Sequence, residues 1–271
     1  MRSISHSASI LLSFLFLLSA CALVQADDQQ RIWQFSSGTE QNLLLELFTS
    51  EGCSSCPPAD RWMSGLKESP QLWSRIVPVA FHVDYWDDLG WKDTYSSPAN
   101  THRQQIYKLQ RAINAIYTPG FVANGREWRG WFERSPFPPD DADQIGTLDI
   151  TVNRTGREAQ YTASFTNTGR YSDTLPGELT LNVAVLSMDE KTDVRRGENK
   201  GKALHHDFVA RTLQQQGPAK ATRSREDKTA IARITWKGNL KLDHCEHCAI
   251  AAWVSHKNKQ APVQATGGYL E

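Results

Sequence analysis

The sequence has no excess of charge of either sign, because its 271 residues include 30 lysines and arginines and 30 aspartates and glutamates. A basic surface for nucleic acid and an acidic tail are therefore not expected. Cysteine is scarce, with five residues in all, and no low-complexity tract interrupts the chain. A chain of this length can form one large or two ordinary domains with a hydrophobic core, so its size alone does not require disulfides.

Long apolar runs are lacking except near the N-terminus, where residues 10–18 are too few to span a bilayer as a permanent anchor. With a positively charged start and small residues after it, the segment 1–26 is typical of an export signal. Residues 24–26 fit a signal-peptidase site, whereas residues 18–21 resemble a bacterial lipobox that would leave Cys21 acylated. Both cleavage sites predict a periplasmic or secreted protein. Only the second predicts contact with a membrane, through a lipid anchor on Cys21.

Without Cys21, four cysteines remain as two pairs with the same spacing, Cys53/Cys56 and Cys245/Cys248. An oxidising compartment converts thiols into disulfides unless something keeps them reduced. The chemistry of each pair therefore depends on its surroundings.

Residues 27–132 show the order strand, helix, strand, helix, hairpin, which predicts an α/β thioredoxin-like domain. Pro78 indicates that the second strand starts near Val79. The second helix is expected to bury an apolar face made of Ile106, Leu109, Ile113 and Ile116. The expected elements are strands 43–48 and 76–85, helices 58–68 and 98–116, and a hairpin of 121–123 and 127–131.

Residues 133–146 are rich in proline and aspartate and predict a linker. The hydrophobic pattern changes after this segment. Residues 147–271 show period-two alternation between turn residues. This pattern predicts an all-β, antiparallel, sandwich-like second domain. Its expected strands are 148–152, 159–165, 179–186, 206–213, 230–236 and 250–254.

Cys53 and Cys56 follow the first buried strand at the entrance to a helix, which is the arrangement that dithiol redox chemistry needs. Unpaired N–H groups at a helix start favour a thiolate on the first sulfur, and the second is near enough to form a disulfide with it. The pair could instead be an inert disulfide or half of a metal site. Thr118 and Pro119 precede the hairpin, where thioredoxin-type proteins carry a cis-proline loop that faces the cysteines. This proline could instead simply stop the helix.

Glu46 lies within the apolar strand, seven residues before Cys53. A carboxyl group there needs a partner, and desolvation would raise its pKa, so Glu46 is a candidate proton relay for the buried sulfur. It could instead occupy an exposed position at a sheet edge. The helix is expected to start at Pro58, which leaves the cysteines on a loop and predicts a less acidic Cys53 thiol than the spacing alone suggests.

Three residues after the second strand, Asp84, Tyr85 and Trp86, are candidates for substrate binding together with Thr118. Ligands of open α/β sheets gather at the carboxyl ends of the strands, which is where these residues are expected. His82 lies in the strand itself and is expected to be a core histidine.

The second pair lies in the sequence Asp-His-Cys-Glu-His-Cys of residues 243–248. His244, Cys245, His247 and Cys248 are weak candidates for zinc or copper, since side chains that are neighbours in a strand point to opposite faces. The same cysteines also fit a small disulfide in a turn, or a second redox pair that exchanges electrons with the first. Residues 205–207, His-His-Asp, either add a ligand or end a strand. The sequence predicts no resident metal and no cofactor.

Four stretches carry a resemblance to a family: LLLELFTSEGCSSCPPAD, AFHVDYWDDLGWKDTYSSPANTHRQ, IYTPGFVANGR and GENKGKALHHDFVAR. They resemble the secreted, thioredoxin-like bacterial family of unknown function DUF1223. The resemblance implies a thioredoxin fold followed by a β-rich domain, with Cys53 and Cys56 as the centre and Pro119 as the loop proline. It implies no substrate. The sequence departs from a thioredoxin unit at 135–139, which is rich in proline where a final helix is usual.

The residues thus predict a periplasmic thiol–disulfide oxidoreductase that acts on protein or small-molecule thiols and disulfides and exchanges electrons with a redox partner protein. Cys53 would attack and Cys56 would resolve the mixed disulfide. The alternative is a binding protein on a thioredoxin scaffold, whose cysteines hold copper or a permanent disulfide without turnover and whose β domain docks a protein partner.

Overall fold

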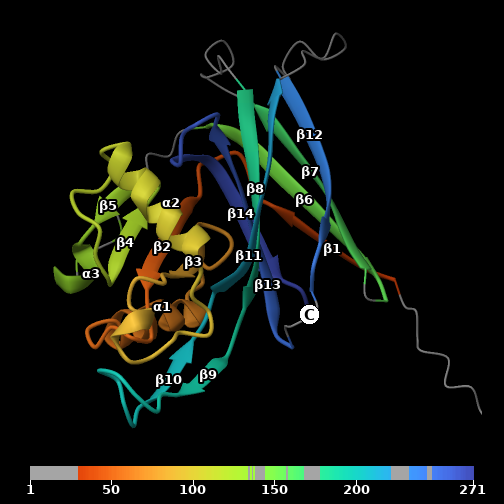
Figure 1. Ribbon diagram of the computed structural model, residues 1–271. Helices are drawn as coiled ribbons and strands as arrows, with labels where there is room; N and C mark the ends of the chain where they lie inside the picture. Colours follow the sequence, from red (N-terminus) through yellow and green to blue (C-terminus); the bar gives the residue numbers. More distant parts are fainter. Residues whose placement is uncertain are drawn as a thin grey trace, which may run out of the picture.

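Strands dominate the fold in the computed structural model of the chain (Figure 1). The described residues form one mixed sheet, one antiparallel sheet and a small two-stranded sheet. The structure describes residues 30–133, 135, 137, 144–156, 158–167, 178–220, 232–242 and 246–271. The predicted export signal 1–26, with Cys21, lies outside the described residues. So does most of the predicted linker.

The largest sheet has eight strands in the order β14-β13-β8-β11-β3-β2-β4-β5. β2 runs parallel to β3 and antiparallel to β4. The two segments predicted as separate domains share this sheet, because β3 and β11 pair in parallel at Ala80 and Val209. The strands are β2 (Leu43–Thr49), β3 (Ile76–His82), β4 (Gly120–Ala123), β5 (Arg126–Trp128), β8 (Glu178–Ser187), β11 (Val209–Lys220), β13 (Cys248–His256) and β14 (Pro262–Tyr269).

Strand β2 is buried along its whole length, as its apolar run predicts for a strand covered on both faces. The prediction that β3 starts near Val79 is wrong, because β3 begins at Ile76 and includes Pro78. The backbone nitrogens of Pro78 and Ala80 face the same edge of β3, which is the edge next to β11. Along this edge β11 pairs only at Ala80, whose N–H donates to the Phe208 carbonyl. The N–H that proline lacks is therefore not needed for the ladder.

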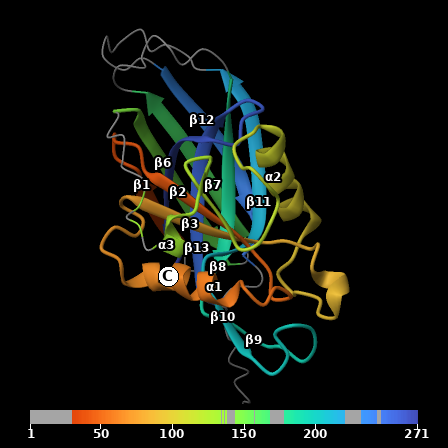
Figure 2. The same cartoon turned by 90° about the vertical axis from the view of Figure 1, so that its left-hand side faces the viewer.

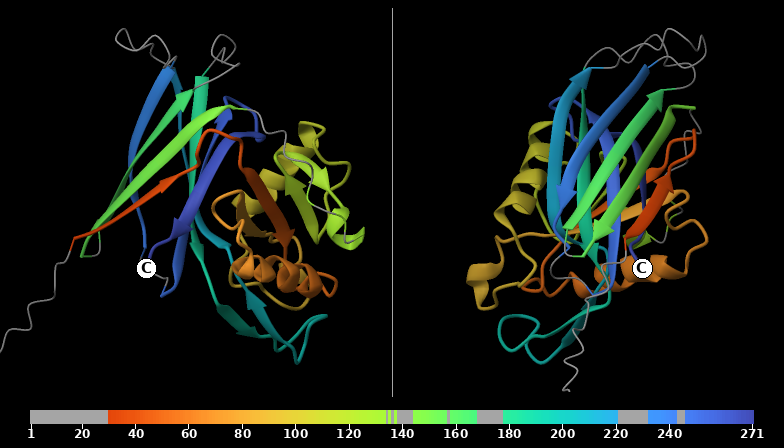
Figure 3. Two further views of the ribbon diagram at one scale, coloured as in Figure 1. Left: turned by 180° about the vertical axis from the view of Figure 1, so that it is seen from behind. Right: turned by 90° about the vertical axis from the view of Figure 1, so that its right-hand side faces the viewer.

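The second sheet has four antiparallel strands in the order β1-β6-β7-β12 and packs against the β8/β13 half of the large sheet (Figure 3). Strand β1 comes from the start of the segment predicted as the first domain but pairs with β6. Its pairing ties the start of the described chain to the later strands. The strands are β1 (Arg31–Ser36), β6 (Gly146–Thr155), β7 (Glu158–Asn167) and β12 (Ala232–Leu240).

The central strands contribute to two cores at once. In β8, Leu181 and Val183 pack into a core with the four-stranded sheet, whereas Ala184 and Leu186 belong to the core on the helix side. In β13, Trp253 also faces the helix side and is fully buried. Since successive side chains alternate between faces, one sheet separates and supports both cores.

Helix α1 (Pro57–Ser64) continues as a 3-10 turn (Gly65–Glu68), close to the predicted 58–68. Helix α2 (Pro98–Leu109) starts as predicted, with the Ser97 side chain accepting from the Ala99 N–H, but it ends seven residues early. Its expected apolar face is wrong, because Leu109 is 79% exposed. The face that α2 buries consists of Asn100, Arg103, Gln104 and Tyr107.

A small hairpin, β9 (Glu190–Asp193) and β10 (Ala203–His206), projects from the later part of the chain and lies against α1 (Figure 2). The helix α3 (Gly130–Glu133) follows β5, where the sequence predicts the end of the first domain. In the described part of the chain, no helix is long and apolar enough to cross a membrane.

Candidate functional site

The C-x-x-C loop connects the end of β2 to the start of α1. Two turns shape it, since the N–H of Cys53 donates to the Ser50 carbonyl and that of Cys56 to the Cys53 carbonyl, each at 3.2 Å. Cys56 caps α1 with helical backbone angles, although it precedes Pro57. The helix therefore starts one residue earlier than predicted. The prolines at its first two positions carry no N–H and remove donors that could otherwise face the sulfurs.

Both cysteines of the loop are reduced and nearly inaccessible, at 1% and 0% exposed. A hydrogen bond from the Cys56 thiol, helped by the Ser55 hydroxyl at 3.2 Å, lowers the pKa of Cys53 to about 6. Burial raises the pKa of Cys56 well above its usual value, and the charge of Asp60 adds to the effect. The sequence predicts a Cys53 thiol less acidic than its spacing suggests, whereas the hydrogen bonds in the structure stabilise the thiolate and lower the pKa.

The loop before β4 faces Cys53. The Thr118–Pro119 peptide bond is cis, and the Thr118 carbonyl lies 3.9 Å from Cys53 Sγ. The Trp86 indole N–H donates to the Thr118 hydroxyl at 2.8 Å. A side chain at Gly52 would meet Cβ of Trp86 at 3.0 Å, so the two loops approach closely at this glycine. Thr118 therefore lies beside the Cys53 sulfur, and Trp86 joins the same group of residues through its bond to Thr118.

Helix α2 supports these residues from behind. The buried Gln104 amide donates to the Tyr117 carbonyl at 2.8 Å and accepts from the Tyr85 hydroxyl at 3.3 Å. Tyr85 is 38% exposed beside the cysteines. Asp84 is different, since its backbone and carboxylate both bond the Thr101 hydroxyl. Asp84 and Tyr85, two of the predicted groove residues, thus both bond side chains of α2.

Glu46 is buried, but its partners lie on the α2 face of the sheet. Its carboxylate accepts from Arg103 Nε at 2.6 Å and from the Tyr107 hydroxyl. Arg103 also donates to Gln260 at 2.5 Å and packs over the Trp253 ring. These bonds keep Glu46 in a closed ion pair, so neither the proton relay nor the exposed sheet edge expected from the sequence describes this residue.

A second buried carboxyl group near the dithiol is that of Asp60, one helical turn after Cys56. Its backbone N–H donates to the Cys56 carbonyl at 3.1 Å, and one carboxylate oxygen accepts from the Thr49 hydroxyl at 2.7 Å. Burial raises the pKa of Asp60, against the opposing charges of His206 and His82. Asp60 therefore has the position and the raised pKa that were expected of Glu46.

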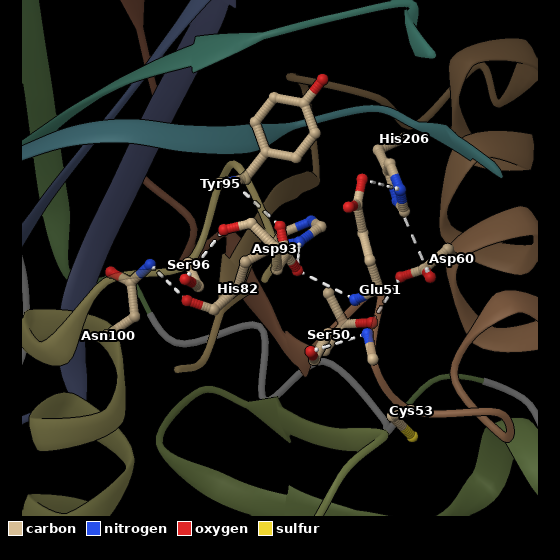
Figure 4. Close-up of polar contacts among 12 residues, drawn as sticks. Ser50, Glu51, Cys53, Asp60, His82, Asp93, Tyr95, Ser96, Asn100 and His206 are labelled. Atoms are coloured by element: carbon tan, nitrogen blue, oxygen red, sulfur yellow. Dashed lines mark hydrogen bonds and ion pairs between the residues drawn. The ribbon is translucent and has the colours of Figure 1, made fainter. Parts of the chain in front are cut away.

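A cluster of buried ionisable groups, here called the acid–histidine cluster, extends from Asp60 behind the dithiol (Figure 4). His206 lies between Glu51 and Asp60, with its nitrogens 3.4 Å and 3.7 Å from their carboxylate oxygens. His82 is a buried core histidine, as predicted, and bonds Asp93 at 2.7 Å. Cys53 lies at the edge of this view with its sulfur directed away from the cluster. The cluster consists of Glu51, Asp60, His82, Asp93 and His206.

The loop between β9 and β10 closes over the C-x-x-C loop. The Asn199 amide donates to the carbonyls of Glu51 and Cys53 at 2.8 and 2.9 Å, and the Glu198 carboxylate accepts from the Ser54 N–H at 3.0 Å. Asn199 is fully buried. The later half of the chain thus supplies part of the site.

These added residues were partly visible in the sequence. Asp60 stands four residues after Cys56, which places both on one helix face. His206 belongs to the stretch 205–207 that the sequence relates to the second cysteine pair or to a strand end. The structure instead buries His206 beside the first pair, while His205 on the opposite face of β10 is exposed. No local signal connects Glu198 and Asn199 with a site about 145 residues earlier.

The second cysteine pair falls partly outside the described residues, with His244 and Cys245 among those left out. Cys248 is buried and disulfide-bonded, and His247 beside it is exposed. A cysteine in a disulfide does not serve as a thiolate ligand, so Cys248 does not support the metal site, while a structural disulfide and a second redox pair both agree with it. Among the residues that the structure describes, no group of histidines, cysteines and carboxylates has the arrangement of a metal site.

Comparison with known proteins identifies a family and a fold. The model of the family described as "Protein of unknown function (DUF1223)" matches residues 44–255. The crystal structure of protein AGR_C_4864 from Agrobacterium tumefaciens is similar with a TM-score of 0.56 and 23% identity, over 83% of this chain and 92% of that one. HBP35 of Porphyromonas gingivalis is similar with a TM-score of 0.55 and 16% identity, over 86% of this chain and 76% of that one. No curated protein matches significantly.

Proposed function

The chain belongs to the DUF1223 family, and from its site we propose that it is a thiol–disulfide oxidoreductase built around Cys53 and Cys56. The observation that carries the proposal is the opposite shift of the two thiols, since the pKa of Cys53 falls to about 6 and that of Cys56 rises. At neutral pH this pair holds one thiolate and one thiol, which is the starting state of dithiol exchange.

The elements around the pair support a thioredoxin-like unit. Strands β3, β2, β4 and β5 are adjacent in that order, with β2 and β3 parallel and β4 and β5 antiparallel to their neighbours. The dithiol precedes the helix after β2, and the cis-Pro119 loop faces it. A thioredoxin-like unit needs these parts in this arrangement.

In the proposed reaction, the Cys53 thiolate attacks a substrate disulfide, forms a mixed disulfide and releases one substrate thiolate. Cys56 then loses its proton and attacks Cys53 Sγ, which forms the Cys53–Cys56 disulfide and releases the second thiolate. The dithiol loses two electrons and the substrate disulfide gains them. The reverse sequence donates a disulfide to a substrate dithiol.

Substrates and compartment are part of the proposal. Protein or small-molecule thiols would bind beside Tyr85, Trp86 and Thr118, and a redox partner protein would restore the dithiol. The export signal favours the periplasm or secretion, where disulfides form. A lipid on Cys21 would add a membrane anchor.

Substitution of each cysteine tests the activity. Cys53→Ala is expected to abolish reduction of insulin disulfides, because no second thiolate is available, whereas Cys56→Ala is expected to accumulate mixed disulfides at Cys53. Mass spectrometry and a turbidity assay provide the measurements. Ser54→Ala, a neighbouring exposed position, is the matched control and should retain activity. Full activity of Cys53→Ala would refute the proposal.

The binding-protein alternative has its own signature. It predicts stoichiometric copper in protein purified from its native compartment and no turnover with disulfide substrates. Metal analysis with a thiol titration in the presence and absence of reductant separates the two functions.

A further inference from the structure

The acid–histidine cluster has more acidic than basic groups in the interior. Its three carboxyl groups and two imidazoles are each at most 6% exposed. Even with both histidines charged, one carboxylate lacks a counter-charge, and an uncompensated charge is costly in a medium of low dielectric constant. One carboxyl group of the cluster is therefore easily protonated.

Asp60 is the group that fits this role. Asp93 is engaged by His82 and by the backbone N–H groups of Glu51 and Tyr95, and its pKa is lowered. Glu51 and Asp60 each have one carboxylate oxygen without a hydrogen-bond partner in the described structure. Asp60 is the one of the two that lies on the first turn of α1, where its N–H bonds the Cys56 carbonyl, and burial raises its pKa.

His206 is the basic residue placed to oppose that effect. Both of its ring nitrogens lack hydrogen-bond partners among the described residues and instead face Glu51 and Asp60 at ion-pair distances. It reaches this position from β10, which packs against α1. His82 lies perpendicular to it with ring centroids 4.8 Å apart, but His82 is already bonded to Asp93.

We propose that His206 is a positioning residue for the dithiol, which keeps Asp60 ionised so that Asp60 accepts the proton of Cys56 during resolution. This inference rests on the proposed function. In the step, the S–H bond of Cys56 breaks and its proton moves to the Asp60 carboxylate. The Cys56 electron pair forms the bond to Cys53 Sγ, and the bond between Cys53 and the bound sulfur breaks with release of a thiolate.

Several other charged or titratable groups face His206 and belong to the pH dependence. The ring centroids of Tyr95 and His206 are 5.9 Å apart. The guanidinium group of Arg211 packs over the Tyr95 ring. Asp207 lines the same enclosed space as His206 and Asp60, and it pairs with Lys67. The facing groups are Glu51 from the C-x-x-C loop, Asp60 from α1, His82 from β3, Tyr95 and Asp93 from the loop before α2, and Asp207 after β10.

A two-phase reaction isolates the step without a physiological substrate. Dithiobis(nitrobenzoate) first oxidises Cys53 to a mixed disulfide with release of one nitrothiolate, and Cys56 then releases the second. Stopped-flow absorbance of the full mature chain at pH 5–9 gives both rates. The variants are His206→Asn, Asp60→Asn and both together. The matched control is His205→Asn, which is exposed on the same strand.

The expected result is confined to the second phase. Without His206 the pKa of Asp60 rises further, so the second phase of His206→Asn moves to higher pH, with about a tenfold loss of rate below its midpoint for each unit of displacement. Asp60→Asn slows this phase at every pH, and the double variant equals Asp60→Asn. His205→Asn matches the wild type.

Two outcomes have different meanings. A wild-type protein without a rapid first phase contradicts the proposed function itself. A normal first phase with an unchanged pH profile of the second in His206→Asn overturns only the role of His206. His206→Gln, which fills more of the imidazole volume, serves the same comparison if the asparagine variant does not fold.

Discussion

At the scale of single residues, the two thiols differ because their neighbours differ. Cys53 accepts hydrogen bonds from the Cys56 thiol and from Ser55, which stabilises its thiolate. Cys56 is buried against the charge of Asp60, which stabilises its neutral thiol. A spacing of two residues creates the pair, but the hydrogen bonds and the burial make the two thiols different, as the proposed roles of nucleophile and resolving thiol require.

The lowered pKa predicts a specific pH dependence for Cys53. Since the thiolate is the reactive form, the rate of alkylation by iodoacetamide should rise with pH and level off above a midpoint of about 6. Cys56→Ala removes the hydrogen bond that contributes most and should move the midpoint upward. Rates measured by mass spectrometry between pH 4 and 10 check this. A wild-type midpoint near 9, the ordinary value, would contradict the geometry.

At the scale of elements, strand β2 divides the chemistry between its faces. Thr49 points toward α1 and bonds Asp60, whereas Glu46 and Phe48 point toward α2, where Arg103 and Tyr107 meet them. Helix α2 buries a polar face because its partner strand carries a carboxylate there. The ion pair of Glu46 therefore belongs to the packing of α2, whereas Asp60 lies on the other face of β2, on the helix that begins at Cys56.

The division of faces predicts separable effects of Glu46→Gln. It leaves the buried Arg103 charge without its counter-ion, and loss of one member of a buried pair costs about 3–5 kcal/mol of unfolding free energy. The alkylation midpoint of Cys53 should stay unchanged. Urea unfolding and the alkylation assay measure the two effects.

Glu40→Gln is the control for this prediction. Glu40 pairs with Arg75 at the surface, where it is 47% exposed, and exposed pairs contribute about 0–1 kcal/mol. A shift of the Cys53 midpoint in Glu46→Gln, absent from Glu40→Gln, would restore Glu46 as a proton relay.

At the scale of the whole molecule, the α/β segment and the later strands form one structure. In the eight-stranded sheet, β3 of the α/β segment is adjacent to β11 of the later segment. The guanidinium carbon of Arg103 in α2 also lies 5.0 Å from the centroid of the Trp253 ring in β13. The β9–β10 hairpin adds His206 and Asn199 to the dithiol site. A shared core favours unfolding in a single step.

Cooperativity can be tested with two probes of the same unfolding. The urea midpoint for loss of Cys53 protection against alkylation should equal the midpoint for loss of strand signal in far-UV circular dichroism. Trp253→Ala should lower the free energy of unfolding by about 3–5 kcal/mol and shift both urea midpoints downward together. Ile32→Ala, a 57% exposed position on β1, is the control with little effect. Two separated transitions would show independent domains.

Much of the fold could be predicted because its signals are local. The apolar run of β2, the proline-led start of α2 and the alternation in β6, β7, β8 and β13 all correspond to observed strands and helices. The strands β1, β9, β10 and β14 were not expected. Their sequence patterns are short or mixed, so these segments become strands because of the neighbouring strands with which they pair.

The sequence by itself determined the dithiol, the loop proline and the order of elements, because these depend on spacing and on residues with restricted backbone angles. Tertiary structure decided on which face of β2 each buried carboxyl group lies. Glu46 and Asp60 are both acids near the cysteines in sequence. On opposite faces of β2, however, Glu46 bonds Arg103 of α2 and Asp60 of α1 bonds Thr49. It also decided that His206, 153 residues after Cys53, lies beside Asp60, since only the folded sheet brings β10 against α1.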